Sequence, residues 1–342
     1  MDQSPTGYDV GALMYSPANA HGTIVDALKN ERIPHPFSLA FCLEDTVREE
    51  AVAEAEQMLH RTLAQIAAAR RETPFYLPLI FVRVRSPQQM RKLASAFSGF
   101  AELLTGFILP KFSIENCGAY VGAIQDIRRH TGLDYRYMPI LESPSMLPLH
   151  QRYAHLAQVK DCLEAVSPQI LNIRVGGNGL CHAFGLRRDA AHTIYDIRPV
   201  AGLLTDLVTT FAPQYILSGP VWEYYRGEGW ETGLRRELEL DRLCGLIGKT
   251  VIHPNQIPVV NDGLKVSAAD YQDARQILAW DPTNPRLVCS SAESTRMNEY
   301  NTHFRWADRV LRLARTYGVK DSLKDPKSPS LQDFPHEPQG SV

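Results

Sequence analysis

The segment LPLIFVRV (77–84) is an apolar run of strand length that stops at arginines, side chains that bind anions. Seven further apolar runs recur every 25 to 45 residues, with helix-like sequence between most of them. They are ALMYS (12–16), LAFCLED (39–45), GFILPK (106–111), MPILES (138–143), ILNIRV (170–175), YILSG (215–219) and KTVIH (249–253). A strand–helix unit repeated eight times is the count of a (β/α)8 barrel. We therefore predict an α/β fold, a (β/α)8 TIM barrel, with its site at the C-terminal strand ends.

The stretches between these runs have helical periodicity. From Glu44 onward, apolar residues recur at three- and four-residue steps as far as Ile66. Arg70 and Arg71 follow at the predicted helix end, where they complement the helix dipole. Similar amphipathic stretches lie at 87–103, 115–131, 147–164, 197–211 and 233–246. An open doubly wound sheet is the rival, because periodicity cannot distinguish a closed from an open sheet.

After the eighth run the pattern becomes purely helical. Helices are expected at 267–280 and 296–318, separated by a Pro- and Ser-rich loop at 281–291. We predict four parts: a flexible N-terminal arm (1–10), a TIM-barrel catalytic domain (11–262), a C-terminal helical extension (263–320) and a disordered tail (321–342).

Composition places the chain among ordinary soluble proteins. Of its 342 residues, 44% are hydrophobic and 22% charged, and the net charge is −2. This balance gives no electrostatic basis for binding nucleic acid or an anionic membrane. No apolar run reaches the length of a membrane span and no signal peptide opens the chain, so a cytoplasmic location is expected. The six cysteines are scattered without CxxC spacing, which indicates passive free thiols.

Two strand ends carry the strongest chemical signals. Alternation along the third run places Arg83 and Arg85 on the same face. An arginine there suits a carboxylate or enolate, although a rim salt bridge is an equal alternative for either one. Glu142 closes the apolar MPIL of the fifth run, where a carboxylate must be solvated, paired or bound to a cation. Mg²⁺ often takes one or two carboxylates and leaves its other positions to water and substrate.

Further candidates follow the second and fourth runs. Glu44 and Asp45 are adjacent and point to opposite faces if the strand continues, so only one is expected to enter the barrel mouth. Lys111 ends the fourth run, and we expect it to pair with a charge rather than to form a Schiff base, which requires a desolvating pocket.

The glycine-rich segment VGGNGLCHAFG (175–185) permits a tight turn and close approach of a ligand. It matches neither a Walker motif nor the dinucleotide fingerprint, so a phosphate-handling enzyme is a minor reading. His182 is interpreted as structural. His253 ends the eighth run as either a proton carrier or a packing residue.

Taken in order, these strand ends resemble the HpcH/HpaI aldolase and citrate lyase β-subunit superfamily. The resemblance covers about residues 10–315, and GKTVIHPNQI is its most specific part. The NEYNTH stretch looks more like a divergent branch of lyases from bacterial stress or tellurite-resistance operons. The matching segments are LMYSPAN (13–19), LAFCLEDTV (39–47), VRVRSP (82–87), GFILPK (106–111), ILES (140–143), RVGGNGLCHAFGL (174–186), SGPVW (218–222) and GKTVIHPNQIPVVN (248–261).

The resemblance implies a carbon–carbon bond lyase or aldolase that uses Mg²⁺, or alternatively Mn²⁺. It would cleave or form a β-hydroxy acid or acyl-CoA thioester, with a 2-oxo acid among the expected ligands. Arg83 would hold the carbonyl and enolate oxygens, and Glu142 would bind the metal. Lys111, Gly176 and Gly177 are assigned to substrate binding. A homo-oligomer, a trimer or hexamer, is also implied.

This sequence departs from the family pattern at two positions, one of which is a metal ligand in the family. The family's second metal ligand is an Asp, and the aligned position here is Gly179, beside Asn178. We assign Asn178 as an uncharged ligand, with correspondingly weaker binding. The family's opening Arg aligns with Gly11. Together the two departures argue against an ordinary acyl-CoA substrate. The loss of the acid at Gly179 also favours a rival reading, a catalytically degenerate barrel that binds a metabolite or acts as a scaffold.

The general base is left open by the sequence. Asp45, His253 and Glu299 are the candidates, the last because RMNE (296–299) matches the family's GxMID segment. In the family that acid reaches the barrel mouth of a neighbouring subunit. We carry Asp45 and Glu299 forward as catalytic residues together with Arg83.

Overall fold

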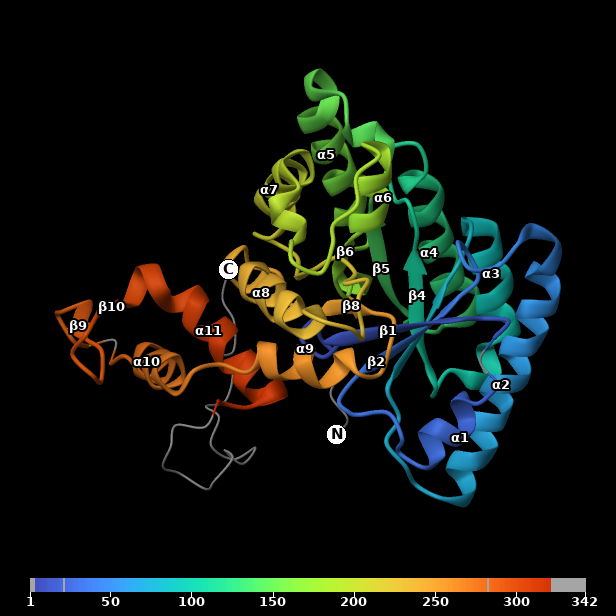
Figure 1. The fold of residues 1–342 in the computed structure, drawn as a ribbon, viewed down its shortest axis with the longest axis horizontal. Coiled ribbons are helices and arrows are strands. Elements are labelled where there is room, and N and C mark those ends of the chain that lie inside the picture. The colour runs from blue at the N-terminus through green and yellow to red at the C-terminus, as the bar shows by residue number, and fades with distance from the viewer. Residues whose placement is uncertain (1–3, 21, 282, 321–342) are drawn as a thin grey trace. The chain divides into compact units, whose positions relative to one another are not determined.

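The computed structural model describes residues 4–20, 22–281 and 283–320. Eight strands form one parallel sheet in which each of the first six strands pairs with the next along the chain and the eighth pairs with the first (Figure 1). Helices lie on its outer side. The strands are β1 (Ala12–Pro17), β2 (Ser38–Cys42), β3 (Leu79–Arg83), β4 (Leu104–Leu109), β5 (Arg136–Leu141), β6 (Ile173–Val175), β7 (Leu217–Ser218) and β8 (Lys249–Val251). Each lies within or beside one of the predicted apolar runs.

The sheet closes on itself. The first strand, β1, pairs with β8, with Met14 opposite Val251. A parallel bridge between Gly219 and Lys249 joins the end of β7 to β8. The order runs without reversal, whereas a doubly wound sheet would reverse at a switch point. The predicted TIM barrel is confirmed, and the open-sheet rival is wrong.

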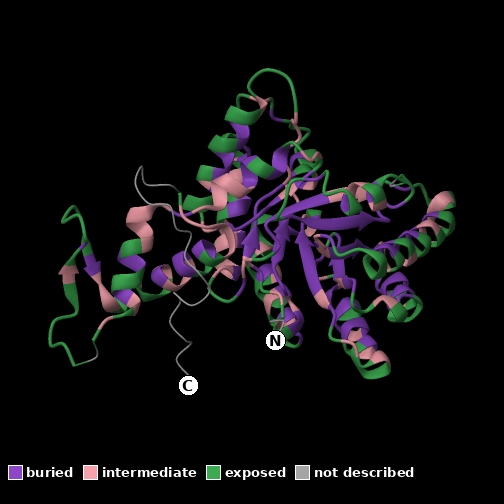
Figure 2. Cartoon of the chain, turned by 90° about the horizontal axis from the view of Figure 1, so that it is seen from below, coloured by how far each residue is buried: buried purple, intermediate pink, exposed green. Residues whose placement is uncertain are grey.

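Amphipathic helices cover the strands. In α2, for example, Ala55, Leu59, Leu63 and Ile66 are buried at three- and four-residue spacing. Figure 2 shows the strands as buried and the outer helix faces as exposed. The helices of the barrel are α1 (Ile24–Lys29), α2 (Val52–Glu72), α3 (Pro87–Ala96), α4 (Cys117–Thr131), α5 (Leu149–Glu164), α6 (Gly177–Ala183), α7 (Arg198–Phe211), α8 (Trp230–Leu243) and α9 (Gln256–Leu264).

The barrel interior is a packed core. Leu13, Ala40, Phe81, Ile108 and Met138, from five successive strands, form one buried cluster. Layers of inward-pointing side chains fill such barrels, so ligands bind at the strand ends rather than through a pore. A ligand site is therefore expected at the C-terminal edge of the sheet.

A buried ionic network supports the last two strands. Lys249 Nζ on β8 donates to Glu237 Oε1 at 2.6 Å and to Asp241 Oδ2 at 2.7 Å, both on α8. Arg188 Nε lies 3.2 Å from Glu237 Oε2. The side chains of Lys249 and Glu237 are 0% exposed. Because β7 has only two residues, these charged contacts help to stabilise the part of the sheet where the barrel closes.

Contact density divides the chain into two compact units, Met1–Val260 and Asn261–Val342. The described part of the predicted loose arm is a hydrogen-bonded turn. Thr6 N and Oγ1 both donate to Asp9 Oδ2 at 2.7 Å, and Val10 is fully buried. The predicted disordered tail, 321–342, lies outside the described residues.

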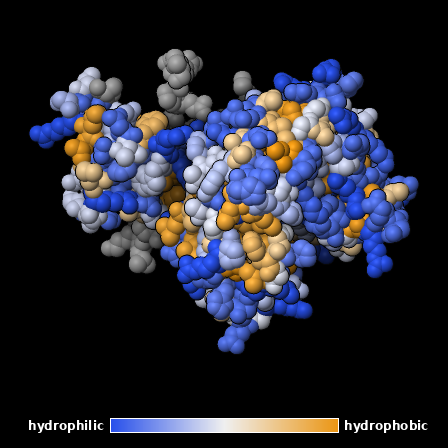
Figure 3. Space-filling model, turned by 90° about the horizontal axis from the view of Figure 1, so that it is seen from above, coloured by the Kyte–Doolittle hydropathy of each residue, from blue (hydrophilic) through white to orange (hydrophobic). Residues whose placement is uncertain are grey.

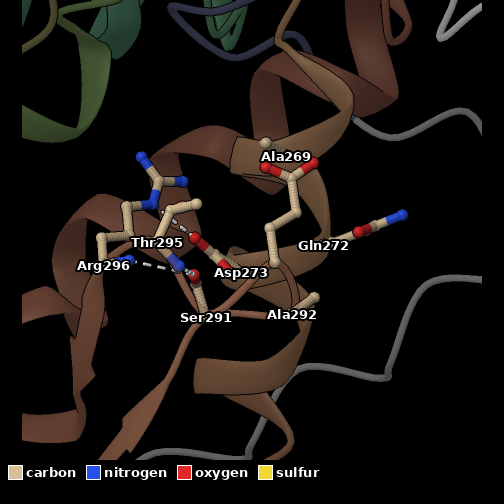
Figure 4. Close-up of a pocket in the computed structure, with 8 residues that line it drawn as sticks. Ala269, Gln272, Asp273, Ser291, Ala292, Thr295 and Arg296 are labelled. Atoms are coloured by element: carbon tan, nitrogen blue, oxygen red, sulfur yellow. Dashed lines mark hydrogen bonds and ion pairs between the residues drawn. The ribbon is translucent and has the colours of Figure 1, made fainter.

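The second unit is built on two helices, α10 (Ala268–Leu278) and α11 (Tyr300–Tyr317). Between them, β9 (Val288–Ser290) pairs antiparallel with β10 (Met297–Glu299), where we predicted a loop and the start of a helix. The residues at 297–299 pair with β9, so α11 begins four residues later than predicted. Figure 4 shows a small pocket of this unit in which Arg296 is paired with Asp273.

The surface in Figure 3 is mainly hydrophilic, with hydrophobic residues gathered in places. Leu149, Tyr153 and Leu243 are among the exposed large apolar side chains. Among the described residues, no helix is both long and apolar enough to cross a membrane. All six cysteines are free thiols, as predicted.

Candidate active site

Arg83, the last residue of β3, is the centre of a charged cluster at the C-terminal edge of the barrel. It is only 8% exposed. One nitrogen, Nη2, contacts three carboxylates: Glu44 Oε2 at 2.6 Å, Asp45 Oδ2 at 2.9 Å and Glu142 Oε1 at 3.3 Å. The structure thus brings together predicted residues from three different strand ends.

The two neighbouring acids both face Arg83, so the prediction that only one enters the mouth is wrong. Side chains alternate between the two faces only while a strand continues, but β2 stops at Cys42. Glu44 and Asp45 therefore lie in the loop, where the side chains no longer alternate. Asp45 N donates to Glu44 Oε2 at 3.0 Å, which holds the pair together.

Lys111 completes the cluster and is the charge-pairing lysine expected from the sequence. Its Nζ donates to Glu44 Oε1 at 2.6 Å and to Asp45 Oδ1 at 3.2 Å. The hydrogen bond to Glu44 is the main cause of a raised pKa at Lys111. A raised pKa keeps this amine protonated at neutral pH, which opposes a Schiff-base role.

Arg85 does not share the face of Arg83. The strand ends at Arg83, so period-2 alternation does not extend to Arg85. Its Nη1 donates to the carbonyls of Leu43, Glu44 and Val47 at 3.0 to 3.1 Å, and its Nη2 donates to Glu49. Arg85 therefore holds the loop that carries the two acids, which is a structural role.

The glycine-rich segment folds into the short helix α6 rather than an open loop, and its close approach is to Glu142. A Cβ atom at Gly176 would lie 2.1 Å from Glu142 Oε2, and one at Gly179 would lie 2.8 Å from the same atom. Gly177 instead packs against Pro220. The absence of side chains at Gly176 and Gly179 makes room for the carboxylate of Glu142 beside the first turn of α6.

Burial and charge oppose each other at the acids. Burial raises the pKa of Glu142, an effect only partly offset by the nearby charge of Arg83. Asp45, whose side chain is 53% exposed, has a lowered pKa. Burial alone would raise the pKa of Asp45, but the hydrogen bond with Glu44 and the charge of Arg83 together lower it by more. Asp45 is thus the more readily ionised of the two.

The donor set fits a magnesium ion held by one protein carboxylate. Glu142 Oε2 has no hydrogen-bond or ion-pair partner among the described residues. Three carboxylates against the two cations Arg83 and Lys111 leave one negative charge in excess. Within the described ranges, no cluster of three or more His, Cys, Asp or Glu side chains forms a ready metal site. One carboxylate plus water and substrate is a common Mg²⁺ arrangement.

The remaining candidates lie outside the cluster around Arg83. Asn178 is exposed on the first turn of α6, and His182 is exposed on its last turn. The ring of His253 stacks on Tyr225 at 4.5 Å, and its Nδ1 accepts from Asn255 N. Glu299 ends β10, which belongs to the second unit.

Sequence reasoning missed Arg174 and Tyr15. Arg174 lies on β6 and is only 1% exposed, and its Nη2 donates to Thr250 Oγ1 at 2.7 Å. The Cζ of Arg83 lies 5.9 Å from the ring centroid of Tyr15 on β1. The sequence does contain a signal for Arg174. An arginine inside the apolar run ILNIRV must point either to the barrel interior or to the surrounding helices, and both are buried.

The sequence profile of a family described as the C-C bond lyase of the TIM-barrel fold matches residues 4–319. The chain belongs to this family. The match to this lyase family confirms the resemblance drawn from the strand ends, and a citrate lyase and a CitE protein are among the structures that share the fold. No curated protein sequence matches the chain.

Solved structures share the fold at low sequence identity. A citrate lyase from Burkholderia xenovorans superposes with a TM-score of 0.67 at 16% identity, covering 93% of this chain and 95% of its own. The CitE protein of Mycobacterium tuberculosis, in complex with magnesium, acetoacetate and coenzyme A, gives 0.59 at 16% identity, covering 90% and 99%. RipC of Yersinia pestis gives 0.53 at 16%, covering 77% and 99%.

Proposed function

We propose that this protein is a Mg²⁺-dependent carbon–carbon bond lyase or aldolase that works through an enolate. Its substrate would be a β-hydroxy acid or an acyl-CoA-type thioester, cleaved or formed. The observation that carries the proposal is the arrangement around Arg83. Three carboxylates share its Nη2, while its buried Nε has no partner among the described residues and Nη1 contacts only the sulfur of Cys42, at 4.0 Å.

Arg83 then has two roles in the proposed reaction. The carboxylates fix the guanidinium in place before any substrate arrives. Either Nε or Nη1 remains available to donate to the substrate carbonyl oxygen, which becomes an enolate oxygen as the carbon–carbon bond breaks. Donors oriented in advance toward developing charge are among the largest contributions to catalysis, about 3 to 4 kcal/mol for a single donor.

Glu142 is the proposed metal ligand, with Asn178 as a possible second donor after movement of its exposed side chain. A bound Mg²⁺ supplies Lewis-acid polarisation of the substrate oxygen. The CitE protein of Mycobacterium tuberculosis has been crystallised with magnesium together with pyruvate, and with magnesium, acetoacetate and coenzyme A. These complexes support the choice of metal and of a small oxo acid as ligand. Mn²⁺ is the natural substitute.

Asp45 is our proposed general base for the hydroxyl proton. It is the most accessible acid of the cluster, and its lowered pKa keeps it ionised at neutral pH. Lys111 holds its other oxygen and would also attract an anionic substrate. Glu299 is the alternative base. The variants Asp45→Asn and Glu299→Gln distinguish the two, because only the variant that removes the base should lose turnover. Gly176 and Gly177 would let substrate approach the backbone.

We further propose a cytoplasmic homo-oligomer, a trimer or hexamer. Exposed Leu149 and Tyr153 on α5 and Leu243 on α8 are apolar side chains that an interface would cover. Light scattering coupled to size-exclusion chromatography tests this directly, and a monomeric mass at micromolar concentration would exclude it.

A second candidate function is a barrel that binds a metabolite without catalysis. It is favoured by Gly179, where the family has an acid and where this chain has no side chain that could bind a metal. In this reading the metal site has decayed, and Arg83 serves only to organise the loop acids. Ligand binding without turnover would distinguish it from the enzyme.

Calorimetric titration with pyruvate, with and without Mg²⁺, tests the enzyme proposal. Pyruvate should bind more tightly with Mg²⁺, and Glu142→Ala should remove that difference. Arg83→Ala should weaken pyruvate binding in both conditions. Glu49→Gln, a change at an exposed carboxylate paired with Arg85, is the matched control and should bind as the native protein does. If pyruvate and oxaloacetate fail to bind under any metal condition, the proposal is wrong.

A further inference from the structure

Arg174 is a fully buried cation without an anionic partner. Within the part of the chain that the structure describes, its Nε and Nη1 have no hydrogen-bond partner, and Nη2 donates to Thr250 Oγ1. None of the described acids forms an ion pair with it, in contrast to Arg188, a second buried arginine, which pairs with Glu237. An unpaired buried charge is among the most costly features a fold can hold.

Its surroundings place it beside the candidate active site. Arg174 on β6 reaches across to Thr250 on β8, so its side chain lies inside the barrel. Tyr15 on β1 interacts electrostatically with Arg174 and also with Arg83 and Glu142. Tyr15 is partly exposed, whereas Arg174 is not. The partly exposed Tyr15 thus interacts with both arginines.

The charge on Arg174 persists at neutral pH. Burial lowers its pKa to about 10, which still leaves the guanidinium protonated. The same burial raises the pKa of Tyr15, so its hydroxyl stays neutral and cannot serve as the counter-ion. The barrel interior therefore holds a permanent positive charge whose Nε and Nη1 have no partner among the described residues. A carboxylate is an anion that a guanidinium binds well, because its oxygens accept hydrogen bonds and neutralise the charge.

We propose that Arg174, supported by Tyr15 and Thr250, binds a free carboxylate of the substrate beside the candidate active site. The inference rests on the proposed function for the reaction, and it adds the residue that holds the carboxylate of the fragment that enters. That fragment is a carboxylic acid whose reacting carbonyl lies toward Arg83 and Glu142, and its carboxylate is paired with Arg174. A thioester alone would leave Arg174 unpaired.

The test compares pyruvate with methyl pyruvate, which has the same carbonyl but no charge, in metal-free buffer with chelator. The native protein should prefer pyruvate by at least about tenfold, as expected for donors to a charged group. Arg174→Met should reduce that preference to near unity. Arg174→Lys should recover part of it. Arg136→Met is the control, since it removes an arginine near the amino-terminal end of the neighbouring strand β5 and should leave the preference unchanged.

Thermal unfolding gives a second, independent measurement. Because Arg174→Met removes an unpaired buried charge, the ligand-free variant should be as stable as the native protein or more stable, and pyruvate should no longer raise its Tm. If the variant loses stability but keeps the native preference for pyruvate, Arg174 is structural and the inference is wrong. If Arg174→Met does not fold, the preference for pyruvate over methyl pyruvate is measured with Arg174→Lys instead. A preference equal to that of the native protein would then show that the inference is wrong.

Failure of this inference can be distinguished from failure of the proposed function. If Arg174→Met retains both the preference for pyruvate and Mg²⁺-enhanced binding, only the inference is wrong. If the native protein prefers pyruvate through Arg174 but shows no effect of Mg²⁺ and no turnover, the carboxylate site stands and the lyase proposal fails. If the native protein does not prefer pyruvate, the inference is overturned.

Discussion

Glu142 presents one carboxylate oxygen to Arg83 and the other to the first turn of α6. Its Oε1 lies 3.3 Å from Arg83 Nη2, and its Oε2 lies where a Cβ on Gly176 would come within 2.1 Å. The relationship explains why the segment after β6 is rich in glycine. Side chains there would occupy the space of the carboxylate that we propose as the metal ligand.

Gly176→Ala should therefore destabilise the protein. The new Cβ would meet not only Glu142 Oε2 but also the Cβ of Glu142 at 2.4 Å, which is fixed to the backbone. Overpacking of this kind costs about 1 to 3 kcal/mol. Gly179→Ala should cost less, because the nearest atom, at 2.8 Å, is the movable tip of the same side chain. Urea unfolding measures both.

Gly122→Ala is the matched control for these changes. Gly122 lies within α4, and its nearest neighbour would be at an ordinary contact distance of 3.8 Å. Alanine should stabilise the helix by up to about 1 kcal/mol. If Gly176→Ala proved as harmless as Gly122→Ala, the tight packing of Glu142 against α6 would be refuted.

Glu142→Gln should change how stability depends on pH. Because the pKa of Glu142 is raised in the folded protein, the folded state binds its proton more tightly than the unfolded state does. The native free energy of unfolding, relative to the Gln variant, should therefore fall as pH rises from the ordinary value of 4.5 through the raised pKa. Denaturant unfolding at a series of pH values checks this. A difference that grows with pH would mean that Arg83 outweighs burial.

Arg83→Met should destabilise the fold as well as remove function. The variant leaves Glu44, Asp45 and Glu142 with only Lys111 as a counter-charge. Breaking a buried charge cluster from one side costs about 3 to 5 kcal/mol. Mild acid should recover part of this loss, because protonation relieves the repulsion between the acids. A variant with native stability at neutral pH would show that the cluster does not depend on Arg83.

Lys249→Met tests the closure of the barrel away from the site. Lys249 is fully buried between Glu237 and Asp241, and its loss should cost about 3 to 5 kcal/mol. Lys29→Met removes an exposed lysine 3.9 Å from Glu72 and should cost less than about 1 kcal/mol. Equal effects of the two changes in thermal or urea unfolding would contradict the structural role given to the buried network.

The barrel and two of its site residues could be predicted from sequence because both follow from periodicity. An apolar run that ends in a charged residue marks a strand and its C-terminal end, which identified Arg83 and Glu142. The same rule misplaced Arg85, and it wrongly separated Glu44 from Asp45. Alternation holds only while the strand lasts, and sequence does not show the residue at which pairing stops.

Features that depend on contacts between distant segments were not predictable. The glycines of α6 signalled a close approach, but only the structure identifies Glu142 as the group that approaches. Arg174 looked like one more residue of a strand, since its surroundings include Tyr15 on β1 and Thr250 on β8, which are far away in sequence. The hairpin of β9 and β10 was missed because each strand has three residues, too few for a period to appear.

The central claim is that Arg83 and Glu142 stabilise an enolate with Mg²⁺, and proton exchange tests it without knowledge of the natural substrate. In D₂O with Mg²⁺, the native protein should exchange the methyl protons of pyruvate for deuterium, seen by proton NMR as loss of the methyl signal. Arg83→Met and Glu142→Gln should each abolish this exchange, and Glu49→Gln should not. No exchange by the folded native protein, or undiminished exchange by either site variant, would contradict the account.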